Sequence, residues 1–315
     1  MNKVLFLYYD YGKITYIFLN RYIMKSKNNS AVALSKITAS MAIFGTIGIF
    51  VRHIGLPSGS IAFVRGVLGT VFLLIVMLIG KKKLCTESIK KNLIKLVLSG
   101  VFIGINWILL FEAYNYTTVA CATVCYYLSP VFVMLASPIV LGEKLTLKKT
   151  VCILTALLGV VLVSGIFTEG IGKITGVLMG IGAAVLYATV VLINKHMKDI
   201  GSYDMTVVQL ACAAVTILPY TLIAETMDPA AFTAKAMVML LIVGTVHTGL
   251  AYVMYFGAVK ELPAQTAAIF SYIDPAIAII LSALILREPI DAPGIIGAVL
   301  VLGSTLVCEL PAKNK

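Results

Sequence analysis

Residues 113–142 read AYNYTTVACATVCYYLSPVFVMLASPIVLG and contain no charged side chain. A run of roughly 18 or more mostly apolar residues without charges is long enough to cross the hydrocarbon core of a bilayer as a helix. Further uncharged runs cover 150–168, 174–194, 205–224 and 236–259. These runs predict a polytopic helical membrane protein, because segments of this kind need lipid around them.

The overall composition excludes the soluble classes of protein. Of the 315 residues, 60% are apolar and 12% are charged, whereas about a quarter of the residues in soluble proteins are charged. A soluble enzyme, a disordered chain and a disulfide-stapled secreted domain are therefore not expected. The six cysteines follow neither a disulfide framework nor a zinc spacing, and no metal or other cofactor is expected.

Apolar runs, together with turn and charge signals, predict ten transmembrane helices joined by short connections. The expected fold class is an all-α polytopic membrane protein. The predicted spans are 37–53, 59–80, 93–114, 119–141, 149–167, 175–194, 204–227, 236–259, 264–286 and 292–309.

The net charge of +11 fits this topology better than it fits nucleic-acid binding, which a soluble protein of this charge would suggest. With ten spans, 20 of the 25 Lys and Arg residues lie on the side of both termini, four lie on the other side, and Arg65 lies within a span. Cytoplasmic loops carry such an excess of basic residues. Both termini are therefore predicted in the cytoplasm, in a multi-pass protein of the inner (cytoplasmic) membrane with no nucleic-acid partner.

An internal repeat divides the chain. With a shift of 145 residues, Tyr127-Leu-Ser-Pro130 aligns with Tyr272-Ile-Asp-Pro275, and each proline is followed thirteen residues later by a glutamate. Upstream, Phe44-Gly-Thr46 matches Tyr187-Ala-Thr189 at a shift of 143. The repeat unit spans five helices, so the second copy enters the membrane from the opposite side, as in many alternating-access transporters.

The expected domain organisation follows from this repeat. A cytoplasmic segment, 1–36, precedes a first repeat, 37–167, and a second repeat, 175–309, precedes a short cytoplasmic tail, 310–315. Residues 1–23 match neither the repeat nor a targeting signal. They are interpreted either as the product of a misassigned start codon, with Met24 as the true start, or as an amphipathic segment at the membrane interface.

Two sets of motifs resemble the EamA-type repeat of the drug/metabolite transporter superfamily. The first set is Phe111-Glu-Ala-Tyr-Asn-Tyr-Thr-Thr118, then Tyr-Leu-Ser-Pro130, then Gly142-Glu-Lys-Leu-Thr146. The second set runs from Phe256 through Asp274-Pro275 to Arg287-Glu-Pro289. Each motif is short and degenerate, but their doubled order is specific, and the resemblance covers residues 37–309.

The resemblance implies a secondary transporter of a small metabolite, such as an amino acid or a related amphipathic compound, working by alternating access and favoured as an exporter. A multidrug efflux carrier is the rival within the same class. A membrane-embedded enzyme or a channel is the alternative from another class, although the chain has no H-E-x-x-H or G-x-S-x-G motif, so an enzyme is not expected. The expected partners are the substrate, the lipid bilayer and H⁺ as coupling ion, for a monomer or a homodimer.

Asp274 is the leading candidate for the site, because it is the one carboxylate at the middle of a predicted span and an ionisable group at that depth is costly. Pro275 leaves the carbonyl of Ser271 without its helical partner, so a carboxylate, a free carbonyl and the Tyr272 hydroxyl come together in one turn. The other repeat offers Ser129, the Tyr126 carbonyl and the Tyr127 hydroxyl around Pro130. Alternatively, both prolines are simple kinks and Asp274 is an inert, hydrogen-bonded group.

Other residues are weaker candidates for substrate binding or coupling. His247 lies mid-span and can carry a proton, or it can simply be held by Thr245 or Thr248. Arg65 can pair with an anion or extend its charged end to the interface. The full candidate set for substrate binding or coupling is Asp274, Tyr272, Tyr127, Tyr126, Ser129, Asn106, Trp107, Tyr252, His247 and Arg65, with Pro130 and Pro275 as helix breaks.

The predicted topology can be tested with reporter fusions after Lys83 and after Lys173. Because three predicted spans separate these positions, the two fusions should report opposite sides of the membrane, with the fusion after Lys83 in the cytoplasm. A cytoplasmic signal from both fusions would show that the span count is wrong.

Overall fold

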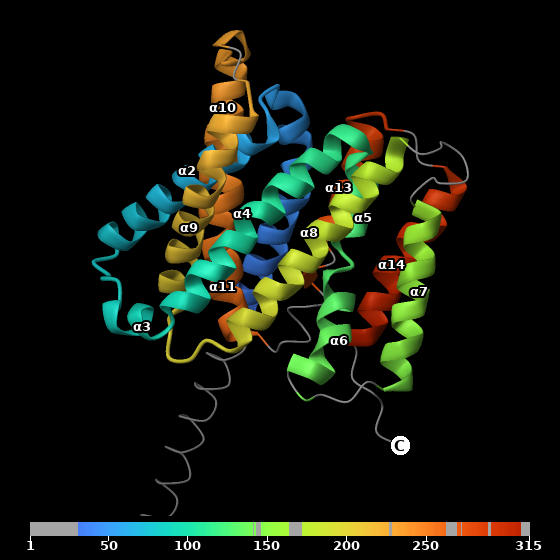
Figure 1. The fold of residues 1–315 in the computed structure, drawn as a ribbon, viewed down its shortest axis with the longest axis horizontal. Helices are drawn as coiled ribbons and strands as arrows, with labels where there is room; N and C mark the ends of the chain where they lie inside the picture. The colour runs from blue at the N-terminus through green and yellow to red at the C-terminus, as the bar shows by residue number, and fades with distance from the viewer. Residues whose placement is uncertain are drawn as a thin grey trace, which may run out of the picture.

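The computed structural model describes residues 31–140, 142, 146–163, 172–226, 229–262, 270–271, 273–288 and 291–309. Residues 1–23, for which two interpretations are given above, the C-terminal tail and Tyr272 lie outside these ranges. All regular elements in the described ranges are helical. Figure 1 shows the bundle that they form.

The helices begin and end close to the limits that the apolar runs suggest. In chain order they are Ala31–Ile54, α2 (Ser58–Ile79), α3 (Thr86–Lys91), α4 (Leu93–Tyr116), α5 (Val119–Tyr126), α6 (Ser129–Val140), α7 (Leu147–Val163), α8 (Gly172–Lys195), α9 (Ser202–Ala224), η1 (Pro229–Ala231), α10 (Ala234–Ile242), η2 (Val243–Leu250), α11 (Ala251–Glu261), α13 (Ile273–Leu284) and α14 (Ala292–Glu309).

Seven helical segments in the described ranges are long and apolar enough to cross a membrane. They confirm the prediction of an all-helical polytopic membrane protein. Three shorter apolar helices, Thr150–Leu162, Ile273–Leu284 and Ala292–Ser304, lie where the fifth, ninth and tenth spans are predicted. A full crossing takes about 20 residues, so the count of ten spans remains a prediction.

Large apolar side chains point away from the bundle on many of these helices. Ile139, Leu147 and Ile223 are more than 80% exposed, and the outward faces of α2 and α9 carry further examples. In water such a surface would be strongly unfavourable, whereas hydrocarbon tails solvate it. The outer surface of the bundle is therefore suited to lipid.

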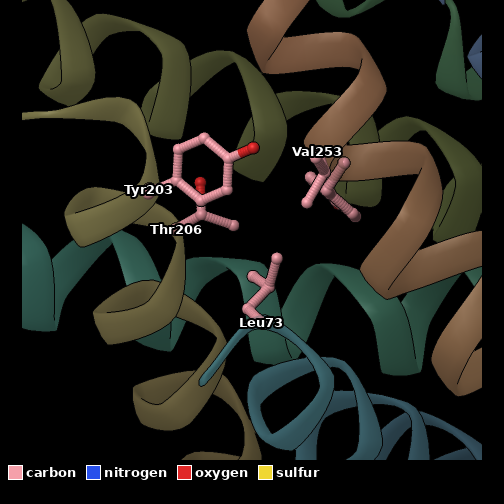
Figure 2. Close-up of a pocket in the computed structure, with 5 residues that line it drawn as sticks. Leu73, Tyr203, Thr206 and Val253 are labelled. Carbon is pink, nitrogen blue, oxygen red and sulfur yellow. The ribbon is translucent and has the colours of Figure 1, made fainter. Parts of the chain in front are cut away.

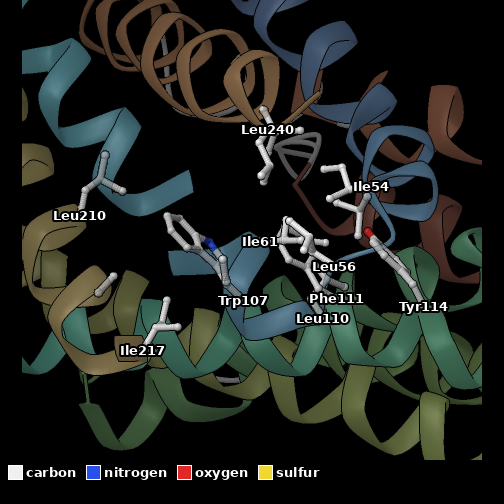
Figure 3. Close-up of a cluster of buried hydrophobic side chains, with 14 of the residues drawn as sticks. Ile54, Leu56, Ile61, Trp107, Leu110, Phe111, Tyr114, Leu210, Ile217 and Leu240 are labelled. Carbon is white, nitrogen blue, oxygen red and sulfur yellow. The ribbon is translucent and has the colours of Figure 1, made fainter. Parts of the chain in front are cut away.

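Helices from the two halves of the chain pack closely against each other. In Figure 1, α4 runs beside α8 and α9, while α7 and α14 lie side by side at one edge. The largest hydrophobic cluster joins Trp107 and Phe111 on α4 to Leu210 and Ile217 on α9 and to Leu240 on α10 (Figure 3). The largest hydrophobic cluster therefore includes residues of both halves.

Glycines let α4 and α9 approach closely. A Cβ atom on Gly100 would lie 2.9 Å from the carbonyl oxygen of Gln209, and one on Gly104 would lie 3.0 Å from that of Ala213. Small residues permit such backbone approach in membrane helices. The side chain of Gln209 then reaches Ser99 and Asn194, both at 2.7 Å, so its buried amide is satisfied inside the bundle.

Each of the two mid-span prolines lies in the first turn of a helix, Pro130 in α6 and Pro275 in α13. On the first-half side, α5 ends at Tyr126 and α6 begins at Ser129, so the chain turns just before Pro130. Around Pro275, residues 270–271 are helical and α13 begins at Ile273, while Tyr272 between them lies outside the described residues. The helix break at Pro275 therefore stays a prediction.

Candidate functional site

A hydrogen bond joins the two halves of the chain at the predicted mid-span site. The hydroxyl of Tyr127, in the turn between α5 and α6, donates to Oδ2 of Asp274 at 2.6 Å and also lies 3.3 Å from the carbonyl oxygen of Ser271. This carbonyl is the one that Pro275 deprives of its helical donor. The Tyr127 hydroxyl has one proton, and the shorter distance assigns it to Asp274, so a side chain of the first half donates to a carboxylate of the second beside the Ser271 carbonyl.

A third helix closes over the same turn. A Cβ atom on Gly45, in helix Ala31–Ile54, would lie 2.6 Å from the carbonyl oxygen of Asp274. A related contact occurs in the other half, where a Cβ atom on Gly180 of α8 would lie 3.2 Å from the carbonyl oxygen of Ala122 on α5. In both places a glycine of one half lets the backbone of the other approach closely.

Aromatic rings surround this meeting point. Tyr126 packs against Tyr187 with ring centroids 5.5 Å apart, and Phe44 packs edge-on against Tyr252 at 5.4 Å and against Tyr255 at 6.4 Å. Phe44 and Tyr187 were not among the predicted site residues. They are, however, equivalent positions in the repeat alignment, and this equivalence was the available signal.

Arg65 is buried in the bundle rather than extended to the interface. Its side chain is 5% exposed, its Nε donates to Oγ1 of Thr248 at 2.7 Å, and its guanidinium lies 4.2 Å from the ring centre of Trp107. Asp274 and Arg65 lie within electrostatic range of each other, but no direct ion pair joins these two described residues. Of the two alternatives for Arg65, this burial does not fit extension to the interface, and pairing with an anion stays a prediction.

His247 contacts a hydroxyl, but not one of the two that we expected. Its Nε2 lies 2.8 Å from Oγ1 of Thr46, and its ring packs edge-on against Phe50 with centroids 4.8 Å apart. Thr248 is occupied by Arg65 and, as donor, by the carbonyl of Val243. The π-helical turn η2 allows His247 and Thr248, although adjacent, both to be buried, and such turns are frequent at functional sites.

The remaining candidates differ in how they lie. Asn106 donates its amide to the carbonyl of Ala183 and is 1% exposed, so it joins α4 to α8 instead of lining open space. Ser129 is buried at the first position of α6. Pro130 lies within α6, but its side chain is outside the description, as is Tyr272 entirely.

A small pocket adjoins Tyr252. It lies between α2, α9 and α11, and Figure 2 shows Leu73, Tyr203, Thr206 and Val253 around it. Leu73 is in the second half of α2, and Tyr203 is in the first turn of α9. The predicted topology places both of these helix ends toward the cytoplasm.

The opposite end of the bundle is held by an ion-pair network formed by Arg52, Thr117, Val119, Ser282 and Glu288. Nη2 of Arg52 lies 3.0 Å from Oε1 of Glu288 and also donates to the carbonyl of Thr117. Oε2 of Glu288 accepts from the backbone N–H of Val119 and from the Ser282 hydroxyl. This outer ion-pair network ties helix Ala31–Ile54 and the α4–α5 junction to the segment after α13.

The EamA-like transporter family model matches the chain twice, over residues 32–165 and 174–309. The Bacillus subtilis (strain 168) protein named uncharacterized transporter YxxF is 30% identical over 261 residues, which cover 81% of this chain and 82% of the relative. An uncharacterized transporter of Archaeoglobus fulgidus is 24% identical over 272 residues, covering 86% of this chain and 94% of the relative.

A solved crystal structure has the same fold. It aligns with a TM-score of 0.64 and 16% identity, and the alignment covers 87% of this chain and 96% of the other. At this identity the match concerns the fold alone.

The coupling between Tyr127 and Asp274 can be measured with a double-mutant cycle of Tyr127→Phe and Asp274→Asn. Hydrogen bonds to charged groups contribute about 1.5–3 kcal/mol, so we expect the two variants to be non-additive by about 1–3 kcal/mol in unfolding from detergent micelles. Tyr116→Phe, at the exposed end of α4, is the matched control. Additive effects within error would show that the hydrogen bond contributes nothing to stability.

Proposed function

This chain belongs to the EamA-like transporter family, and on that premise we propose that it is a secondary transporter working by alternating access. Its cargo is a small metabolite, an amino acid or a related amphipathic compound, which it moves across the cytoplasmic membrane. The observation that carries the proposal is the hydrogen bond from Tyr127 to Asp274. It places a titratable carboxyl group at the contact between the two halves of the chain, where a relative movement of the halves would change its surroundings.

The packing of the helices supports the inverted-repeat architecture with ten spans. A pseudo-twofold axis exchanges each span with its equivalent in the other half. A contact between two spans should therefore be accompanied by a contact between their two equivalents, and a contact between two equivalent spans is its own counterpart. The contact of α4 with α9 has such a counterpart in the contact of α2 with η2. Three further contacts join equivalent spans of the two halves: α2 with α9, α5 with α13, and α7 with α14. Inverted-repeat transporters bind substrate near the midplane, at the interface between repeats.

The outer ion-pair network supplies a closure that alternating access requires. It joins elements of both halves at the end of the bundle that our topology places outside the cell. Arg52 is about one third exposed and Glu288 about one tenth, and the Glu288 carboxylate also accepts from Val119 and Ser282. Opening this closure in each transport cycle would exchange one ion pair and a few hydrogen bonds.

We propose export as the direction. The outer end is held closed by the ion-pair network, whereas the small pocket beside Tyr252 lies toward the helix ends that we place at the cytoplasm. A substrate leaving the cell would enter from that side. The aromatic rings near Asp274 would also suit a lipophilic cation, and this observation favours multidrug efflux as the second candidate.

We propose H⁺ as the coupling ion and Asp274 as the group that carries it. Tyr127 donates to this carboxylate, so protonation of Asp274 would weaken the contact between the two halves. His247 is the other titratable side chain in this region, but Thr46 and Phe50 enclose it and it is 2% exposed. Asp274 can therefore link proton occupancy to substrate occupancy more directly than His247.

The substrate can be sought by a thermal-shift screen of the purified protein against a metabolite library. The compound that stabilises the protein is then assayed for saturable flux in proteoliposomes. Saturable, gradient-dependent flux would distinguish a carrier from a channel. A resistance panel in a sensitised strain would test the alternative of multidrug efflux.

Asp274→Asn should abolish the pH dependence of flux, or flux itself, because asparagine is nearly isosteric but cannot titrate. The amide oxygen can still accept from Tyr127, so expression and folding should stay close to normal. Ser129→Ala, at the equivalent position of the other repeat, should have a milder effect because it removes no charge. Wild-type flux and pH dependence in Asp274→Asn would leave the paired prolines as packing features only.

A further inference from the structure

The guanidinium of Arg65 is a buried cation with unused hydrogen-bond donors. Arginine has five N–H groups, and in the described structure only Nε–H has an acceptor, Oγ1 of Thr248. Among the described side-chain nitrogen and oxygen atoms that are sealed from solvent, Thr117 Oγ1 alone lacks a hydrogen-bond partner. The terminal nitrogens of Arg65 therefore keep some accessible surface, and no acceptor in the described residues occupies them.

The surrounding side chains fix the orientation of this cation. Thr248 donates its own proton to the carbonyl of Val243 in the π-helical turn, so its oxygen is left to accept from Arg65. Thr248 also packs against Gly69, one turn along α2 from Arg65, where a Cβ atom would clash with its methyl group. The face of the guanidinium rests on Trp107 at 4.2 Å, with Phe111 at 5.5 Å.

This geometry leaves one edge of the guanidinium free for bidentate binding. With Nε–H bound to Thr248 and the flat face against Trp107, the edge formed by the two terminal nitrogens remains available. That edge matches the spacing of two oxygens of a carboxylate or a phosphate. An arginine with a purely structural role at this depth would be expected to use more of its donors, because buried charges are costly unless they are paired.

A short series of contacts links Arg65 to Asp274: Arg65 binds Thr248, the adjacent His247 contacts Thr46, and the neighbouring Gly45 packs against the backbone of Asp274. The two opposite charges are not joined by an ion pair, so both remain available to a ligand. A molecule that carries an anionic and a cationic group would complete both sites at once. A carboxylate rather than a phosphate fits a region with one described cation, because a phosphate carries up to two negative charges.

We propose that Arg65 is the anion-binding residue of the transport site and receives the carboxylate of a zwitterionic substrate whose ammonium group faces Asp274. This inference rests on the proposed function and specifies its substrate as a compound of the α-amino acid class with an apolar or aromatic body. Trp107 serves as a positioning residue that holds the guanidinium plane.

The test uses the purified full-length protein in detergent and four probes at constant ionic strength: L-phenylalanine, 3-phenylpropionate, 2-phenylethylamine and inorganic phosphate. Phenylalanine and phenylpropionate should stabilise the protein in a concentration-dependent manner. Arg65→Gln should weaken the apparent affinity for both by about tenfold or more, the loss expected when a bidentate charged contact is removed. Arg287→Gln, at an exposed position, is the matched control and should change neither.

A second pair of variants separates the two charges. Asp274→Asn should weaken binding of phenylalanine but not of phenylpropionate, which has no ammonium group. Arg65→Lys keeps the charge and loses the planar fork, so it should lose most of the carboxylate affinity. Arg65→Lys decides the question if Arg65→Gln does not fold.

The proposal is overturned if neither carboxylate stabilises the wild-type protein up to its solubility limit, if phosphate alone does, or if both Arg65 variants bind carboxylates as the wild type does. Because these measurements need no gradient and no flux, they are independent of the test of transport. Carboxylate binding without flux would refute the proposed function alone. Flux by the wild type, together with carboxylate affinities that are the same in Arg65→Gln as in the wild type, would refute this inference alone.

Discussion

Every polar group within the bilayer must find its partner inside the protein, because hydrocarbon offers neither donors nor acceptors. The described part of the bundle meets this constraint mainly with contacts between helices that are distant in sequence. Tyr127 donates to Asp274, Thr46 contacts His247, and Asn106 donates to Ala183. These contacts fix which helices are neighbours, and in doing so they bring the two halves together at mid-span.

The same constraint bears on the movement that the proposed alternating access requires. Lipid-facing surfaces give no strong preference for one helix arrangement over another, since the apolar faces are solvated equally well in each. Close approach through Gly45, Gly100 and Gly104 depends on backbone contact, which allows sliding more readily than interlocked large side chains would. What distinguishes one arrangement from another is therefore a small set of polar contacts, chiefly those of Asp274 and the outer ion-pair network.

The sequence was sufficient for the fold class and for most helix positions, because uncharged runs mark the segments that lie in the bilayer and basic residues mark the loops between them. It also singled out Tyr127 and Asp274 through the repeat, but the contact between them came from the structure. Errors arose where the rotation of a helix about its axis mattered. Asn106 has the depth of a lining residue but faces α8, and His247, in a π-helical turn, contacts Thr46 of another helix as well as the carbonyl of Ile242 in its own segment. Depth can be estimated from a single sequence, whereas the azimuth of a side chain depends on partners in other helices.

Reversible closure of the outer end can be tested most directly by joining Arg52→Cys and Glu288→Cys with a short thiol-reactive cross-linker in proteoliposomes. Flux of the metabolite identified by the thermal-shift screen is measured before cross-linking, after it, and after release by a reducing agent. The account predicts that cross-linking stops flux, that reduction restores it, and that neither single variant responds. Undiminished flux through fully cross-linked protein would contradict alternating access at this site.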